Sequence, residues 1–147
     1  MPEAVFFCCQ QHAPQYFWRP EFQSHVNGAD AVVEVIMVAE QPIALADFFS
    51  KVQEPESIEE GGLGLTVNTP RGAIRVYTPV DVRHRYGDMD LSSFPESPYF
   101  LGFAVHVPDL DRVATHFRSN NVTFGATPES IRVSPNDAFG ALIEFRS

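Results

Sequence analysis

The chain contains an internal repeat, and this repeat constrains its fold more than any single motif does. A strand-like run over residues 32–42 is followed by a helix-like pattern over 43–52, and the same order returns over 101–110 and 111–121. One register aligns the two copies, through the pairs Glu34 and Gly102, Leu45 and Val113, Ala46 and Ala114, and Phe49 and Phe117. Two copies of one unit predict two similar halves that close on each other around a cavity. Small molecules usually bind in such cavities.

Each half is predicted to be a β-α-β-β unit with a weaker further strand. The apolar stripe of the first helix consists of Leu45, Phe48, Phe49 and Val52. The stripe of the second helix consists of Leu110, Val113, Ala114 and Phe117. Pro42 and Asp109 suit the starts of these helices, because proline lacks an N–H and aspartate caps the first turn. The other strands are expected at 63–67, 73–78, 130–134 and 142–146.

The chain is predicted to be a single domain of four segments. They are an N-terminal arm at 1–30, a first unit at 31–79, a linker at 80–99 and a second unit at 100–147. The apolar run Val5–Cys9 predicts a short strand in the arm. The linker contains glycine and proline, and one helical turn is expected near 82–86.

Composition excludes several classes of function. A length of 147 residues with 44% apolar residues fits one globular domain. The net charge of −9 argues against binding to nucleic acid or to an anionic membrane surface, since both require a basic footprint. No stretch approaches the roughly 20 apolar residues of a membrane span. No signal peptide is visible and the adjacent cysteines Cys8 and Cys9 are expected to be reduced, so a cytoplasmic location is expected.

Alternation along the strands separates a helix-facing set from a cavity-facing set. The helix-facing set on the later strands is Ile74, Val76, Ile143 and Phe145. The polar residues expected on the opposite face are Glu34, Arg75, Tyr77, His106, Glu144 and Arg146. Polar side chains gathered on one face of otherwise apolar strands indicate a ligand site.

The chain resembles the glyoxalase-like domains of the vicinal-oxygen-chelate superfamily. The resemblance rests on the repeated unit, on the segment Trp18-Arg19-Pro20-Glu21 and on the closing run from Asn136 to Phe145. It implies an α+β fold in which two paired βαβββ units form a curved, cup-like sheet with helices on its outer face. Members of this superfamily include lyases, isomerases, dioxygenases and non-catalytic binding proteins, so the resemblance points to the fold more strongly than to an activity.

The same resemblance implies where a metal would bind. In metal-dependent members the ligands come from the first and the last strand of each unit, and the matching positions here are Glu34, Arg75, Gly102 and Glu144. Gly102 offers no side chain and Arg75 carries a positive charge that opposes a divalent cation. No cofactor is therefore predicted. The alternative is a divalent metal held by Glu34 and Glu144 with His12 or His25 from the arm.

Two sets of residues are candidates for a functional role. The candidates for proton transfer are Glu34, Glu144, His12 and His25. The candidates for ligand binding are Arg75, Tyr77, Trp18, Arg19 and His106. Arg75 would bind a carboxylate or phosphate through its guanidinium. Structural alternatives stay open, in which Arg75 forms a buried ion pair with the two glutamates and Trp18 anchors the arm.

These observations predict a cavity that binds a small, anionic organic metabolite without the standard metal site. A metal-dependent lyase, isomerase or dioxygenase is one alternative, and a non-catalytic assembly or regulatory module is another. The expected partners are a small-molecule ligand and a second copy of the chain, since an exposed strand edge in the arm would pair across a homodimer.

Overall fold

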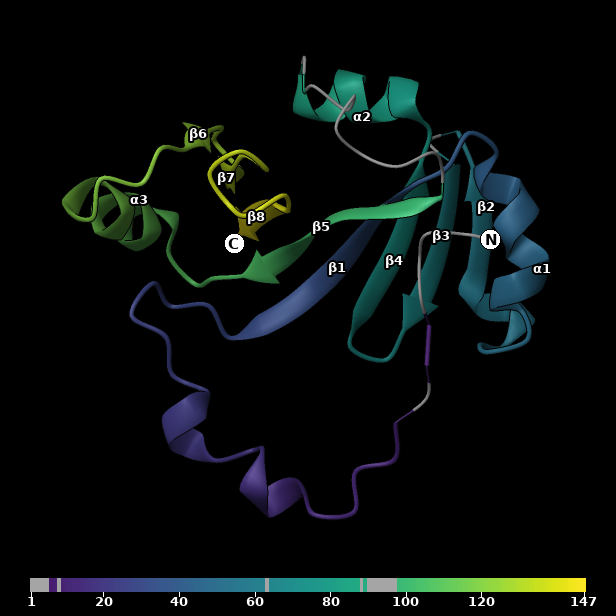
Figure 1. The fold of residues 1–147 in the computed structure, drawn as a ribbon, viewed down its shortest axis with the longest axis horizontal. Coiled ribbons are helices and arrows are strands. Elements are labelled where there is room, and N and C mark those ends of the chain that lie inside the picture. The colour runs from purple at the N-terminus through teal and green to yellow at the C-terminus, as the bar shows by residue number, and fades with distance from the viewer. Residues whose placement is uncertain (1–5, 8, 63, 88, 90–97) are drawn as a thin grey trace. The chain divides into compact units, whose positions relative to one another are not determined.

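A computed structural model describes residues 6–7, 9–62, 64–87, 89 and 98–147. The chain forms two compact units (Figure 1). The first unit comprises Val33–Gly102, and the second joins Phe6–Val32 to Phe103–Ser147. The N-terminal arm therefore belongs to the same unit as the C-terminal third of the chain.

The first unit is a four-stranded sheet with helical segments. Its strands are β1 (Ala31–Val38), β2 (Ile58–Gly61), β3 (Gly64–Thr69) and β4 (Gly72–Tyr77), in the order β2-β3-β4-β1. β1 and β4 are parallel, whereas β2, β3 and β4 are antiparallel neighbours. The helical segments are η3 (Pro42–Leu45), α1 (Ala46–Phe49), η4 (Pro55–Ser57) and α2 (Pro79–Tyr86). The core on one face of the sheet contains Met37, Phe49, Leu65, Val67 and Val76.

The first helix is shorter than the sequence predicts. Residues after Pro42 form one 3₁₀ turn, and α1 covers only four residues. A 3₁₀ turn has three residues per turn, so it shifts the apolar positions away from one α-helical stripe. Phe49 is buried, but Phe48 and Val52 are 40% and 55% exposed. The stripe predicted for this helix is therefore wrong at two of its four positions.

The segment predicted as a linker begins with a regular helix, α2. The side-chain oxygen of Thr78 accepts a hydrogen bond from Asp81 N at 3.1 Å, and the Asp81 carboxylate accepts one from Thr78 N at 3.4 Å. This reciprocal capping box, with Pro79 in the first turn, starts the helix. Gly87, at φ 81°, ends it. The capping residues are present in the sequence. The full helix was not predicted, because its apolar residues form only a weak pattern.

The second unit repeats the plan of the first. Its strands are β5 (Tyr99–His106), β6 (Gly125–Ala126), β7 (Ser130–Val133) and β8 (Leu142–Arg146), in the order β5-β8-β7-β6. The helix α3 (Leu110–Ser119) begins at Asp109, whose carboxylate accepts hydrogen bonds from Asp111 N at 2.9 Å and Arg112 N at 3.1 Å. All four residues of its predicted apolar stripe pack in the core of this unit. Here both the N-cap and the stripe are confirmed.

The arm contains two short turns, η1 (Pro14–Tyr16) and η2 (Pro20–Phe22). Its C-terminal end is fixed to the second unit, because Asp30 N donates to His106 O at 3.2 Å and Arg112 Nε donates to Val26 O at 3.2 Å. Part of the strand predicted at Val5–Cys9 lies outside the described residues, and Phe6, Phe7 and Cys9 are not in a strand.

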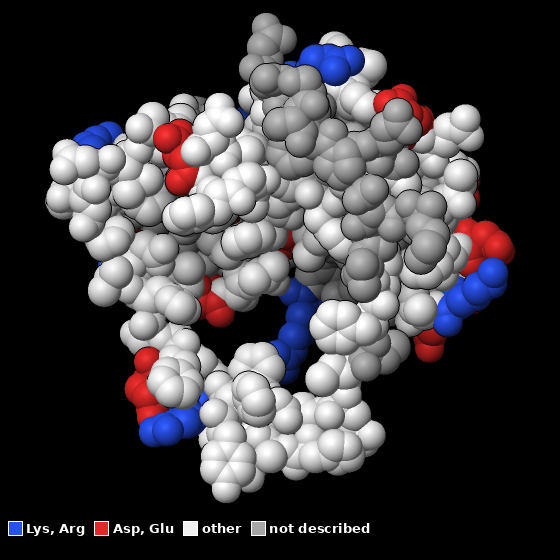
Figure 2. All heavy atoms as spheres, viewed as in Figure 1, with Lys and Arg blue, Asp and Glu red and all other residues white. Residues whose placement is uncertain are grey.

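Two surface properties agree with the composition. No helix among the described residues is long and apolar enough to span a bilayer. On the face shown in Figure 2, the described Lys and Arg side chains lie singly and form no large basic patch.

Candidate functional site

A row of polar residues crosses the sheet of the first unit. Glu59 on β2 pairs with Thr66 on β3, and Thr66 pairs with Arg75 on β4. Their neighbours Leu65 and Val76 point to the opposite face, where both are buried in the core. The alternation predicted for β4 is confirmed at Val76, which packs in the core, while Arg75 lies on the polar face.

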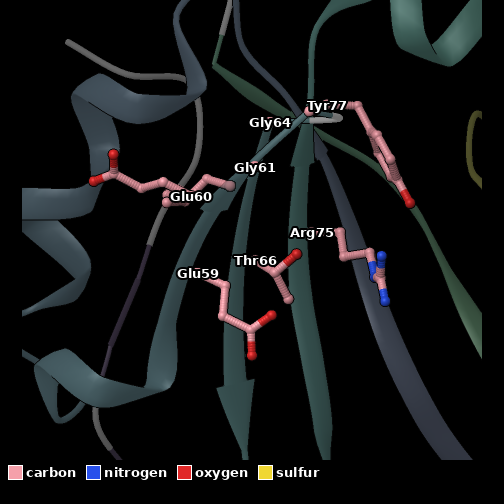
Figure 3. Close-up of a pocket in the computed structure, with 9 residues that line it drawn as sticks. Glu59, Glu60, Gly61, Gly64, Thr66, Arg75 and Tyr77 are labelled. Atoms are coloured by element: carbon pink, nitrogen blue, oxygen red, sulfur yellow. The ribbon is translucent and has the colours of Figure 1, made fainter.

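This polar face holds a pocket of about 270 Å³ (Figure 3). Side chains of Glu59, Thr66, Arg75 and Tyr77 line it, together with Glu60, Leu65 and the glycines 61, 62 and 64 of the β2–β3 connection. The glycines matter because a Cβ at 61 or 62 would meet nothing within 4 Å, so the backbone there borders open space. The alternation along the strands predicted Arg75 and Tyr77 as site residues, but nothing in the sequence pattern predicted Glu59 or Thr66.

Arg75 is held by a buried carboxylate. Its Nε lies 2.9 Å from Oε2 of Glu34, whose side chain is only 4% exposed. The Nε itself is buried and makes no well-aligned hydrogen bond, while the Arg75 side chain as a whole is 42% exposed. The ion pair that the sequence left open as an alternative is present with Glu34. It fixes the guanidinium at one end and leaves part of the side chain open to a ligand.

Tyr77 forms the wall of the pocket beside Arg75. The residue is buried, and its ring meets that of Tyr86 on α2 edge-on, with centroids 6.4 Å apart. The guanidinium of Arg85 lies 5.9 Å from the same ring. These contacts hold the aromatic wall in place.

The second unit carries a related cluster around Glu144. Oε1 of Glu144 accepts a hydrogen bond from Arg132 Nε at 3.0 Å, and Oε2 accepts one from Arg146 Nε at 2.9 Å. Burial alone would raise the pKa of the Glu144 carboxyl, but the hydrogen bonds and charges of Arg146 and Arg132 outweigh it and lower the pKa. Arg132 was not predicted from the sequence. It pairs with Glu144 across β7 and β8, and such a partner follows only from the register of two strands.

The arm candidates lie in the second unit, whereas the pocket lies in the first. His12, Trp18, Arg19 and His25 are all exposed. Arg19 forms an ion pair with Glu21 and lies 5.2 Å from the ring of Phe22. The structure thus brings together Glu34, Arg75 and Tyr77 among the predicted residues. Glu144 and the arm residues belong to the second unit.

His106 stands at the end of β5, where its Nδ1 lies 2.8 Å from Oδ1 of Asp30. The backbone of the same two residues is also hydrogen bonded. The contacts of His106 fasten the arm to the second unit.

Solved structures of methylmalonyl-CoA epimerases share this architecture. The enzyme from Mycobacterium tuberculosis has a TM-score of 0.59 at 17% sequence identity, over 84% of this chain and 91% of that chain. A Streptomyces coelicolor methylmalonyl-CoA epimerase in complex with 2-nitronate-propionyl-CoA has a TM-score of 0.52 at 16% identity, over 80% and 96%. The chain has the vicinal-oxygen-chelate fold. The resemblance noted in the sequence is confirmed at the level of the fold, although no family model and no curated protein matches the sequence.

The residues of this chain do not fit the metal site of that fold. Among the described residues, no three His, Cys, Asp or Glu side chains lie together in a group that could hold a metal ion. Glu34 already faces a guanidinium, and Glu144 is bound by two. A divalent cation would have to displace those arginines and then lie beside their positive charge. Arginine–carboxylate pairs therefore stand at the positions that the resemblance assigns to metal ligands.

Proposed function

We propose that this protein binds a small organic metabolite through a carboxylate group, with Arg75 as the anchor in the pocket of the first unit. The observation that carries the proposal is a partly exposed guanidinium that lines a pocket and is braced from behind by the buried Glu34. A guanidinium offers a planar fork of N–H donors that matches a carboxylate. Thr66 adds a hydroxyl beside it, and Tyr77 adds an aromatic wall.

The size of the pocket supports a small ligand. Its volume of about 270 Å³ lies just below the usual range for ligand sites, roughly 300–1,000 Å³. Solved structures of the same fold include a methylmalonyl-CoA epimerase in complex with methylmalonyl-CoA and NH4+, with a TM-score of 0.50 at 18% identity over 78% of this chain and 92% of that chain. In this proposal Glu34 is a positioning residue, because its carboxylate is engaged with Arg75.

Replacing Arg75 tests the proposal. We expect Arg75→Leu to weaken binding of butyrate at least tenfold, because the carboxylate loses its charged donor. The measurement is a titration with butyrate followed by ¹H–¹⁵N NMR, reading the amides of Thr66 and Tyr77. Arg71→Leu is the matched control, since it removes the same charge from the exposed β3–β4 turn.

Because Arg75→Leu leaves the buried Glu34 without its partner, the double variant with Glu34→Gln is measured in parallel. Equal butyrate binding in the wild type and in a folded Arg75 variant would refute the role of Arg75. Shifts confined to amides outside the pocket would do the same.

We further propose that the protein is a homodimer that uses its arm. The arm exposes four large aromatic side chains within seven positions, and they are 72%, 65%, 60% and 59% exposed, namely Tyr16, Phe17, Trp18 and Phe22. Exposed aromatic clusters of this kind mark protein interaction surfaces. We expect light scattering to give twice the 16.4 kDa chain mass, and the double variant Phe17→Ser with Trp18→Ser to be monomeric. Val80→Ser, which removes an exposed apolar residue on α2, is the control, and a wild-type monomer would refute the proposal.

A further inference from the structure

The pocket of the first unit carries opposite charges on its two sides. Arg75 lies on β4 and Glu59 lies on β2, with Thr66 between them on β3 (Figure 3). All three residues line the pocket. A ligand held by Arg75 therefore has a carboxylate of the protein two strands away, on the same face of the sheet.

The balance of charge in the pocket does not favour a simple anion. Arg75 is neutralised by Glu34, and the lining also includes Glu59 and Glu60. A ligand that brings only a carboxylate is attracted by Arg75 and repelled by the other acidic residues. A positive group on the same ligand would turn that repulsion into attraction.

Glu59 is arranged to receive such a group. Asn68 Nδ2 donates to its Oε1 at 2.7 Å, which orients the carboxylate. Glu59 is exposed, and among the described residues no Lys, Arg or His forms an ion pair with it. The carboxylate is thus positioned by a neutral donor while its charge stays uncompensated.

Glu60 differs from Glu59 in direction. It pairs with Leu65, whose side chain is 1% exposed in the core, so the side chain of Glu60 belongs to the opposite face of the strand. Figure 3 shows it pointing away from Arg75. The two neighbouring glutamates therefore have the same charge but different access to a ligand.

We infer that the ligand is a zwitterion, a small amino acid whose carboxylate binds Arg75 and whose ammonium group binds Glu59. This inference rests on the proposed function and specifies its ligand class. Glu59 and Arg75 lie two strands apart, which corresponds to about 10 Å between their backbones. A ligand that contacts both side chains therefore carries its amino group several bonds from its carboxylate, as in 4-aminobutyrate.

The test compares ligands that differ only in the amino group. We expect 4-aminobutyrate to bind the wild-type chain about tenfold more tightly than butyrate, measured by ¹H–¹⁵N NMR titration of the pocket amides. Glu59→Gln should remove this tenfold preference and leave butyrate binding equal or tighter. Glu60→Gln, which removes the same charge from the adjacent position, should keep the preference.

The outcomes separate this inference from the function on which it rests. If butyrate binds in an Arg75-dependent manner and 4-aminobutyrate binds no more tightly, the inference of a zwitterionic ligand is wrong, whereas the proposal that Arg75 binds a carboxylate is supported. If neither compound shifts the pocket amides, both ideas are wrong. Equal loss of the preference in the Glu59 and Glu60 variants would also overturn the inference, because it would reflect net charge rather than contact with Glu59.

Discussion

A Glu144→Gln variant is expected to lose about 3 kcal/mol of its free energy of unfolding, because one buried carboxylate holds two arginines. The side chain of Glu144 is 1% exposed, and those of Arg132 and Arg146 are 24% and 23% exposed. Removing the charge leaves two guanidinium groups together without their counter-ion. Since both arginines keep some access to water, the loss should lie at the lower end of the range for broken buried pairs, about 3–5 kcal/mol. Urea denaturation at neutral pH measures it.

The same contacts predict how stability depends on pH. Arg146 and Arg132 hold the pKa of the Glu144 carboxyl below its ordinary value of 4.5 in the folded chain. A carboxyl whose pKa is lowered in the folded state stabilises the fold in full at any pH above its ordinary pKa. This stabilisation is lost as the pH falls through the lowered, folded-state pKa. The difference in unfolding free energy between wild type and Glu144→Gln should therefore be largest above pH 5 and should shrink below pH 4.

Glu129→Gln is the control, because it removes an exposed carboxylate from the same unit. It should change stability by less than about 0.5 kcal/mol. If Glu144→Gln is as stable as this control, or if its deficit does not depend on pH, the two arginines do not stabilise the fold through Glu144.

The sequence predicted those features that depend on local periodicity. The stripe from Leu110 to Phe117 and the cap at Asp109 were found because one continuous α-helix keeps a fixed angular step between residues. The alternation on β4 correctly predicted that Val76 lies in the core, because successive side chains of a strand point to opposite faces. Where the geometry changes within a segment, as in the 3₁₀ turn after Pro42, the same rule failed.

The candidate site could be predicted only in part, because its contacts depend on the register between strands. Arg75 and Glu34 meet across a parallel pair whose alignment no local pattern reveals. Although a weaker further strand was expected in each unit, the position of β2 was not predicted. Its sequence Ile-Glu-Glu-Gly has little apolar signal, since β2 lies at the end of the strand order of its unit and presents Glu59 to the pocket.

Gly64 should be intolerant of any side chain, and Gly64→Ala is expected to cost about 3 kcal/mol of stability. The residue begins β3 with φ at +114°, a backbone conformation that favours glycine. A Cβ built there would lie 2.1 Å from the carbonyl oxygen of Val76, so the two strands would have to separate. For a chain of this length the loss corresponds to a fall in Tm of about 10 °C, measured by thermal denaturation.

Gly61 offers a matched control for Gly64, because the two glycines face each other across the β2–β3 pair. A Cβ at Gly61 would meet nothing within 4 Å, so Gly61→Ala should change the Tm by no more than about 2 °C. A Gly64→Ala variant as stable as Gly61→Ala would show that β3 and β4 can move apart without cost. In that case the strand spacing that sets the distance between Glu59 and Arg75 would not be fixed, and the pocket would lose its selectivity for the separation of two charges.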